Sequence, residues 1–309
     1  MRIAVIFFVL LIHSVSLSAC DFCNCYLGLN PGYNKNTIGL RGNLRFASLD
    51  IPSQNSRVTH LGHDSPVPVH GGTLNETIRS IDLFARIYPV SKLQVLFNLP
   101  YSINTIEYHD SVETRSALSD LTMMAMYQIA NTMAHDSNAV RHRIFAGGGI
   151  KLPTGKYKTP EDVTLPMADD LYSGTGSTDF IFVVSYIGKW HKLGWNADIN
   201  YKLNTENSLN YRYGNSSNIN VRAFYEINFK NLVFYPHLGT AVESGKADVS
   251  EGVKQSNTGG EILYGSAGVD VYYKSISFAS DFRLPLYHNL GEGMAVDKSW
   301  FITSINIHF

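Results

Sequence analysis

The 309-residue sequence has little net charge, few charged side chains and no long apolar run. Charged residues make up 17% of the chain and the net charge is −1, so the chain lacks the basic character of a nucleic-acid-binding protein. Hydrophobic residues make up 44%, which argues against disorder. After Ile12 no apolar run approaches the roughly 18 residues that a membrane helix needs. A helical membrane protein is therefore excluded, whereas a β-barrel stays open, because its alternating strands average out in hydropathy.

A secretory leader occupies residues 1–19. Arg2 gives a positive start, residues 3–12 (IAVIFFVLLI) form an apolar core too short to span a bilayer, and small residues follow up to Ala19. The tetrapeptide that ends in Cys20 (LSAC) resembles a bacterial lipobox, in which the cysteine is lipidated. Ordinary cleavage near Ala19 with an unmodified cysteine is the alternative. We expect a signal peptide and an exported mature chain, with Cys20 as the lipidation candidate.

The cysteines of the chain are clustered at the mature N-terminus, at Cys20, Cys23 and Cys25. A Cys23–Cys25 disulfide would close a very tight, strained ring, whereas thiolates suit a soft metal such as copper or zinc. Cys23 and Cys25 are therefore the metal candidates, although spacing alone does not make a site and we expect no cofactor. We assign residues 20–36 to a periplasmic segment. The histidines of one later loop that would extend a metal site are His60, His63 and His70.

Twelve segments of the mature chain alternate apolar and polar residues with a period of two. Each is about as long as a tilted strand that crosses a membrane. In the first segment Ile38 and Leu40 lie on one face and Arg41 on the other. The expected strands are residues 37–47, 80–88, 93–101, 120–129, 142–151, 179–188, 195–203, 218–229, 232–242, 261–273, 276–284 and 300–309.

Connections between these segments alternate between long and short. An outer-membrane barrel predicts this asymmetry, with short turns in the periplasm and long loops outside the cell. An even number of strands places both termini on the periplasmic side. We therefore expect residues 37–309 to form one domain, an all-β transmembrane, antiparallel, up-and-down barrel of about 12 strands. The expected long loops are residues 48–79, 102–119, 152–178, 204–217, 243–260 and 285–299.

A soluble β-sandwich would also show alternation, and it is the alternative fold. Three features favour the barrel. The apolar face is aromatic at the strand ends, as the girdles at a membrane interface require. The opposite face carries charges in mid-strand. The chain ends on Phe309, which resembles the C-terminal signal read by the bacterial barrel-assembly machinery, and we expect the protein in the bacterial outer membrane.

Two motifs carry a family resemblance. The segment Gly147–Lys156 (GGGIKLPTGK) and the later segment Gly174–Phe180 (GTGSTDF) are similar to a family of bacterial outer-membrane proteins named for the meta-pathway of phenol degradation. That family is grouped with fatty-acid and hydrocarbon channels, so the resemblance implies a barrel with a transport role. The better-understood channels of the group have more strands than the twelve counted here, and residues 21–36 are too short for a large plug.

Common catalytic motifs are missing, and we expect the protein not to be an enzyme. A phosphate-binding loop at Gly155-Lys156 fails because Ile150 and Tyr157 stand where a glycine and a Ser or Thr are needed. The serine-hydrolase elbow fails at Leu263, and no zinc-protease motif occurs.

If the apolar faces point to lipid, the opposite faces point into a lumen. The charges there are nearly balanced, eight positive and seven negative, so they do not select strongly for ions of either sign, and pairs between strands would equally brace the wall. A barrel of this size lies between a filled interior and an open channel. The candidate lumen-lining residues are Arg41, Arg45, Asp82, Arg86, Asp120, Arg143, Lys151, Asp179, Asp198, Lys202, Arg222, Glu226, Asp270, Asp281 and Arg283.

The sequence thus predicts an outer-membrane channel for a small solute, hydrophobic solutes included. Apolar residues that fall inward, such as Phe84, Leu96, Met124 and Phe145, would line the path of such a solute or simply pack the interior. Two alternatives stay open: a copper- or zinc-handling barrel that uses the cysteines, and a structural or adhesive barrel whose loops bind. The expected partners are outer-membrane lipid, the solute and the barrel-assembly machinery, with no nucleic acid.

Overall fold

The computed structural model describes residues 35–51, 72–133, 139–157, 172–256, 258–291 and 295–309. The signal peptide, Cys20, Cys23, Cys25 and the three loop histidines fall outside these residues. The strands are β1 (Thr37–Ile51), β2 (Gly72–Val90), β3 (Leu93–Tyr108), β4 (Ser111–Leu118), β5 (Leu121–Asn131), β6 (Arg141–Leu152), β7 (Asp179–Trp190), β8 (Leu193–Leu203), β9 (Tyr211–Arg212), β10 (Ser216–Tyr225), β11 (Ile227–Phe229), β12 (Leu232–Gly245), β13 (Val249–Ser250), β14 (Val253–Lys254), β15 (Gly260–Tyr273), β16 (Ile276–Leu290) and β17 (Val296–His308).

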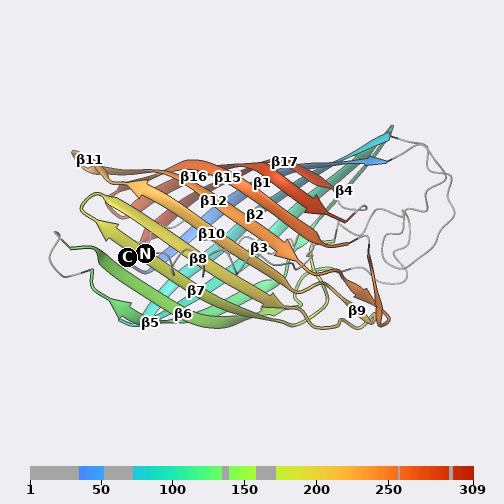
Figure 1. Ribbon diagram of the computed structural model, residues 1–309, viewed down its shortest axis with the longest axis horizontal. Helices are drawn as coiled ribbons and strands as arrows, with labels where there is room; N and C mark the ends of the chain where they lie inside the picture. The colour runs from blue at the N-terminus through green and yellow to red at the C-terminus, as the bar shows by residue number, and fades with distance from the viewer. Residues whose placement is uncertain (1–34, 52–71, 134–138, 158–171, 257, 292–294) are drawn as a thin grey trace, which may run out of the picture.

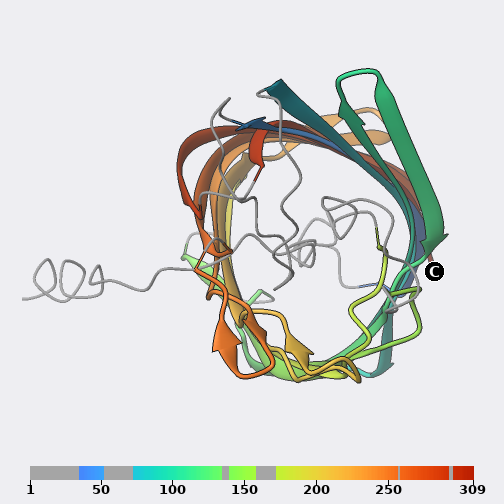
Figure 2. The ribbon, with the colours of Figure 1, turned by 90° about the vertical axis from the view of Figure 1, so that its right-hand side faces the viewer.

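All of these strands except β9, β13 and β14 close into a single antiparallel ring (Figures 1 and 2). Each strand of the ring pairs with the ring strands that precede and follow it in the sequence; β4 and β5 share one position in the ring, and β10 and β11 share another. The ring closes where β1 pairs with β17, from Thr37 opposite His308 to Ser48 opposite Val296. The predicted 12-strand, all-β barrel is therefore confirmed. In the described part of the chain, no helix is long and apolar enough to cross a membrane.

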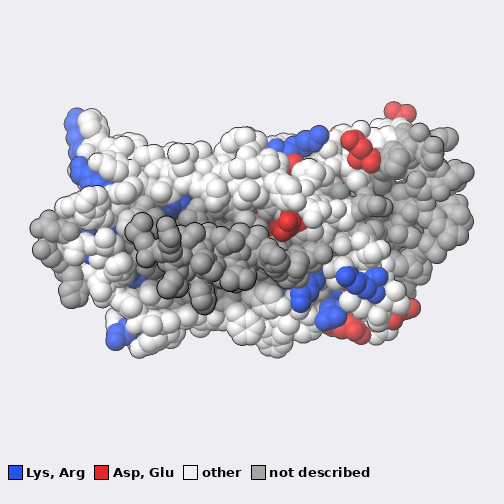
Figure 3. Space-filling model, viewed as in Figure 1, with Lys and Arg blue, Asp and Glu red and all other residues white. Residues whose placement is uncertain are grey.

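The two faces of each strand differ as the alternation predicts. Leu40 and Ile305 lie opposite each other on β1 and β17 and are 55% and 60% exposed, whereas the next pair, Arg41 and Ser304, is buried at 0% and 4%. Apolar side chains thus cover the outside of the ring, where lipid would contact them. On the face drawn in Figure 3, charged side chains gather toward the two ends, and the band between them is mostly uncharged.

Tight turns join the strands at one end of the barrel, and the chain also finishes at this end (Figure 1). Only two residues separate β7 from β8, β11 from β12 and β15 from β16. In each of these turns the first residue has a positive φ, 49° at His191, 54° at Lys230 and 52° at Lys274, as two-residue hairpins with right-handed strand twist require. This end corresponds to the predicted periplasmic side.

Several strands run further outward than the sequence predicts. The expected loop 102–119 is instead a hairpin, in which β3 continues to Tyr108 and β4 returns from Ser111. The expected loop 285–299 is largely strand as well. These extensions carry polar residues on both faces, as in the Thr105–Thr114 hydroxyl pair at 3.0 Å, so the alternation that marks membrane-embedded segments is missing there. Backbone pairing sustains them without an apolar face.

A second, three-stranded sheet lies beyond the barrel at the outer end (Figure 1). Its strands β9, β13 and β14 come from two different loops. The Tyr211 hydroxyl donates to Asp248 at 2.5 Å, and the Gly214 amide donates to the same carboxylate at 2.7 Å. These contacts hold the loop before β10 against the loop after β12.

Placing a charge on the outside of the barrel should destabilise it. We expect Ile305→Arg to lower the free energy of unfolding by about 2–4 kcal/mol, because a guanidinium at this position would lie in the hydrocarbon. Val253→Arg is the control: Val253 is 64% exposed but lies in the outer sheet, beyond the barrel. Urea unfolding in lipid vesicles measures both variants, and an equal loss in the two would contradict the lipid-facing assignment.

Candidate functional site in the barrel interior

The structure places the candidate lumen-lining residues on the inner side of the strands. Twelve of the fifteen are buried, and the remaining three, Arg45, Glu226 and Asp281, are partly buried. Glu226 lies apart from the others, at the tight-turn end between β10 and β11, where it pairs with Lys189. Whether they contact a solute stays a prediction. The interior charges form separate clusters, described below from the middle of the barrel to its ends.

One cluster lies on the wall formed by β1, β2 and β3. The Arg41 guanidinium pairs with Asp82 at 2.6 Å, and both side chains are fully buried. Arg41 also donates to Asn98 at 3.0 Å, and Asp82 accepts from Ser80 at 2.7 Å and from Asn43 at 3.1 Å. The charges and most polar atoms are thus satisfied within the wall, which is how a buried ion pair avoids a large desolvation penalty.

A second cluster lies on β8, β10, β12 and β15. Asp198 accepts from Ser185 at 2.5 Å and from Asn196 at 2.6 Å, and Asn196 accepts from Arg222 at 2.9 Å. Arg222 in turn lies 3.9 Å from Asp270. The network continues to His237, whose two ring nitrogens lie 4.0 Å from Asp270 and 3.7 Å from Asp281. Charges of both signs therefore alternate across this wall.

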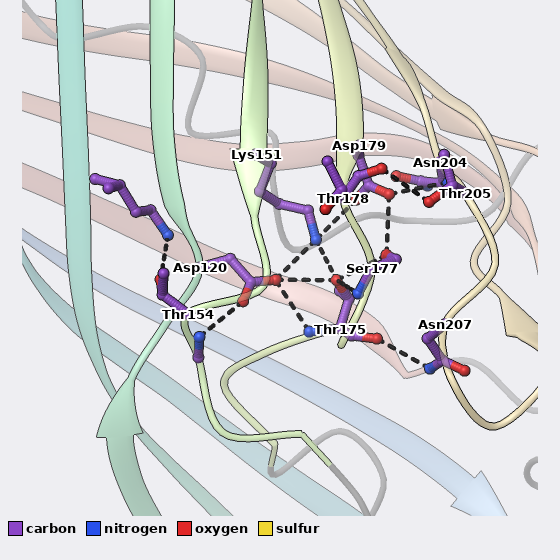
Figure 4. Close-up of polar contacts among 12 residues, drawn as sticks. Asp120, Lys151, Thr154, Thr175, Ser177, Thr178, Asp179, Asn204, Thr205 and Asn207 are labelled. Atoms are coloured by element: carbon purple, nitrogen blue, oxygen red, sulfur yellow. Dashed lines mark hydrogen bonds and ion pairs between the residues drawn. The ribbon is translucent and has the colours of Figure 1, made fainter.

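The outer rim is held by a cluster around Asp120 (Figure 4). The Lys151 ammonium pairs with Asp120 and with Asp179, each at 2.7 Å. The other oxygen of Asp120 accepts from the Gly155 amide at 2.9 Å, and the Thr175 amide donates to Asp120 at 3.0 Å. We call these five residues the rim cluster. Three predicted lining residues, from β6, β7 and the start of β5, thus meet at one point.

Further hydrogen bonds tie the rim cluster to its surroundings. Ser177 donates to Asp179 at 2.9 Å, and the Thr205 amide donates to the same oxygen at 3.0 Å. The Thr154 hydroxyl accepts from the Leu121 amide at 2.8 Å. The two motifs that carry the family resemblance, KLPTG and GTGSTD, therefore have a structural explanation. They fasten both ends of the loop between β6 and β7 to Asp120.

Close contact at the rim explains two motif glycines. A Cβ on Gly155 would lie 2.9 Å from the Cα of Gly174, and a Cβ on Gly174 would lie 2.6 Å from the carbonyl carbon of Gly155. These distances are too short for any side chain, so the two loop ends touch only because both residues are glycine. Sequence reasoning identified the motif and did not identify this contact.

A second ion pair at the outer rim was missed by sequence reasoning. Asp297 accepts two hydrogen bonds from Arg45, at 2.7 and 2.9 Å, and accepts another from the Tyr264 hydroxyl. The sequence placed Asp297 in a loop because the expected strand began at Trp300. A bulge between Phe46 and Ala47 in the pairing of β1 with β17 shifts the alternation here, so Asp297 and Trp300 both face inward.

One part of the interior wall is apolar. It runs over four neighbouring strands, β3, β5, β6 and β7, and we call it the apolar stripe. Met124 lies over Gly149 of β6, since a Cβ on that glycine would be 2.4 Å from the Met124 side chain. The apolar stripe consists of Leu96, Met124, Met126, Phe145, Ile181, Val183 and Ile187.

Metal binding by the cysteines stays untested, since they lie outside the described residues. Within the described ranges, no group of three or more His, Cys, Asp or Glu side chains is arranged to hold a metal ion. His237 with Asp270 and Asp281 comes nearest in composition, but its nitrogens lie 3.7 to 4.0 Å from the carboxylates. Direct ligands of one metal would instead converge on it at about 2 Å.

Comparison with known proteins agrees with the fold. A family described as "Putative MetA-pathway of phenol degradation" matches residues 64–270. The chain is similar to an outer membrane channel from Pseudomonas putida, at 15% identity, 91% and 100% coverage of the two chains and a TM-score of 0.63. It is also similar to the beta domain of the Bordetella autotransporter BrkA, at 9% identity, 89% and 100% coverage of the two chains and a TM-score of 0.48. A FadL homologue from Pseudomonas aeruginosa is similar at 10% identity, 89% and 91% coverage and a TM-score of 0.41. No curated protein matches the chain.

A closed ring with an apolar outside and a polar, charged inside defines an outer-membrane β-barrel. The match over residues 64–270 covers more than half of the sequence, and the chain belongs to that family. The resemblance drawn from the two motifs and the predicted location in the bacterial outer membrane are both confirmed.

The rim cluster should be sensitive to loss of its one cation. We expect Lys151→Met to lower the free energy of unfolding by about 3–5 kcal/mol, because two buried carboxylates would face each other without a counterion. Arg115→Met is the control: the Arg115–Glu113 pair is about a quarter exposed on both sides, so its loss should cost about 1 kcal/mol or less. Urea unfolding in vesicles compares them, and a similar small effect of both would show that the rim cluster is not a buried ion pair.

The contact between the two motif glycines allows a separate test. We expect Gly155→Ala to destabilise the barrel by about 1–3 kcal/mol through overpacking and to expose the loop after β6 to protease. Gly42→Ala on β1 should change little, since its Cβ would lie 3.4 Å from its nearest neighbour, the Thr303 hydroxyl. Limited proteolysis of the folded protein measures the rate of cleavage in the loop after β6. Equal cleavage rates in Gly155→Ala and wild type would rule out the close contact.

Proposed function

We propose that the barrel is a channel that passes a small solute with an apolar body. The observation that carries the proposal is the apolar stripe, a continuous set of seven buried apolar side chains on neighbouring strands. The clusters of charge lie on other parts of the interior wall, around Arg41 and around Arg222. The interior therefore carries its seven-residue apolar stripe apart from these two clusters of charge.

Such a division suits an apolar solute better than an ion. The charged clusters are satisfied by their own partners, so they hold the wall in shape and present little net charge to a passing molecule. Contact with the stripe removes apolar surface of the solute from water, which favours its entry by about 25 cal/mol per Å². Met124 and Met126 add flexible, polarisable surface that adapts to solutes of different shape.

Closure of the ring by backbone pairing does not in itself require an apolar interior. Backbone pairing and the clusters of charge close the barrel, and polar side chains would fill the same inner positions on a purely structural barrel. The sequence alternation requires polar or small residues on an inner face, yet β5, β6 and β7 carry apolar ones there. A transport path for an apolar body accounts for this departure.

Uptake of a hydrophobic dye tests the proposal. N-phenylnaphthylamine fluoresces in lipid and is excluded by an intact outer membrane, so we expect gram-negative cells that make this protein to take it up faster than cells that do not. Met124→Gln keeps the side-chain length and should slow this uptake about four- to fifteenfold, the equivalent of one or two fewer buried methylenes at about 0.8 kcal/mol each.

Met123→Gln is the matched control. Met123 is the preceding residue on β5 and lies on the opposite face of the strand, so the same substitution there should leave uptake near the wild-type rate. Surface labelling checks that all variants reach the outer membrane in equal amount. Dye uptake no faster than in cells without the protein would contradict the channel and favour a structural or adhesive barrel.

A further inference from the structure

Every junction between ring strands at the tight-turn end has a basic side chain. Four of the junctions are two-residue turns, and each of these turns contains one exposed lysine. At the other two junctions, Arg141 begins β6 and the exposed Lys35 lies just before β1, next to the closing pair of strands. We call this set the basic collar, because it is spread around the whole circumference of the barrel. The basic collar consists of Lys35, Lys92, Arg141, Lys192, Lys230 and Lys274.

Acidic side chains are scarce at the same end. Among the described residues of these junctions the acidic side chain is Glu226, and it pairs with Lys189, which is not part of the collar. On the face drawn in Figure 3, the tight-turn end at the left shows Lys and Arg, and the Asp and Glu lie in the half toward the outer end. The outer end mixes the two signs, as in the outer sheet, where Glu251 and Lys254 are both exposed. The tight-turn end therefore presents positive charge on all sides.

Aromatic side chains fix the level of the collar relative to the membrane. Phe229 and Tyr273 are 59% and 45% exposed, and each directly precedes a collar lysine. The Lys230 ammonium lies 5.5 Å from the centre of the Phe229 ring, and the Lys274 ammonium lies 5.3 Å from that of Tyr273. Aromatic rings on the outside of a barrel mark the boundary between hydrocarbon and headgroups. The stacked ammonium groups thus lie at the level of the lipid headgroups.

We propose that the basic collar binds the phosphate groups of anionic phospholipids in the adjoining leaflet, which is the periplasmic leaflet in the predicted orientation. The distribution of the collar favours lipid, because lipid surrounds a barrel on all sides, whereas a protein partner would contact one side. Lysine suits this role, since its stem lies along apolar surface while its ammonium reaches the headgroup. Attraction of each basic side chain to an anionic leaflet then orients the barrel and fixes its depth. The assignment does not depend on transport.

Lipid selection by the folded protein tests this proposal. Wild-type protein is immobilised in a neutral detergent and equilibrated with equal amounts of phosphatidylglycerol and phosphatidylcholine that have the same acyl chains. The retained lipids are extracted and quantified by mass spectrometry. We expect about a fivefold excess of phosphatidylglycerol, the discrimination that one ammonium per anionic headgroup provides. Raising the salt concentration from about 0.01 M to about 1 M shortens the screening length from about 30 Å to about 3 Å and should bring the ratio close to one.

Substitution of the turn lysines locates the effect. The collar variant should lower the excess of phosphatidylglycerol to less than about twofold, because it removes four of the six basic side chains. A control variant removes the same charge from four exposed lysines at the outer end and should keep the wild-type ratio. The collar variant combines Lys92→Gln, Lys192→Gln, Lys230→Gln and Lys274→Gln, and the control variant combines Lys156→Gln, Lys246→Gln, Lys254→Gln and Lys298→Gln.

Three results would overturn the proposal: a wild-type ratio near one at low salt, a collar variant that keeps the wild-type ratio, or a control variant that loses as much as the collar variant. If the collar variant fails to fold, arginine at the same four positions keeps the charge and should keep the ratio, and the salt series on wild type still decides.

Two additions separate lipid from other anionic partners. Release of the retained phosphatidylglycerol by an equal concentration of soluble glycerol phosphate would show a simple phosphate site and contradict the lipid assignment. Equal retention of the two lipids, together with sedimentation of wild type on purified peptidoglycan, would assign the basic collar to the cell wall and overturn the proposal. Retention that resists glycerol phosphate and depends on the collar supports it.

Discussion

The whole structure depends on backbone hydrogen bonds that have no alternative partner in lipid. A strand edge exposed to hydrocarbon would leave its amides and carbonyls unsatisfied at a cost of several kcal/mol for each group. Pairing of β1 with β17 removes the last edge, from Thr37 to Ser48. Closure then divides every strand into an outer and an inner face, and this division sets where each apolar and charged residue can lie. The clusters of charge follow as a second requirement, because arginines and lysines turned inward leave bulk water and need counterions.

Charge pairing in the interior follows different patterns in different places. Arg41 and Asp82 meet within one wall between adjacent strands, so their pair braces the ring locally. Lys151 instead joins the barrel to its loop, since it holds Asp120 and Asp179 at the point where the loop leaves and returns.

Much of the fold was predictable from the sequence, because lipid imposes a pattern with a period of two. Leu40 and Arg41 show it most simply, one outside and one buried. Outside the bilayer that pattern ends, and the hairpin from β3 to β4 was mistaken for a loop. A bulge beside Ala47 hid Asp297, since one extra residue reverses the alternation. The inner charges could be listed from the sequence, but their partners could not. Asp120 meets Lys151 only through the register of β5 against β6 and the close approach of Gly155 to Gly174.

The outer sheet and the rim cluster together unite three loops on one side of the barrel mouth. The Tyr157 hydroxyl lies 3.0 Å from the Ser208 hydroxyl, Tyr211 reaches Asp248, and the Glu251 amide donates to the Asn210 carbonyl at 2.9 Å. An antibody or a bacteriophage that approaches from outside would meet one composite surface made from distant parts of the sequence. Such an epitope exists only on the folded barrel. A linear peptide from any one loop would not reproduce it, and the loss of one loop would alter recognition of the other two.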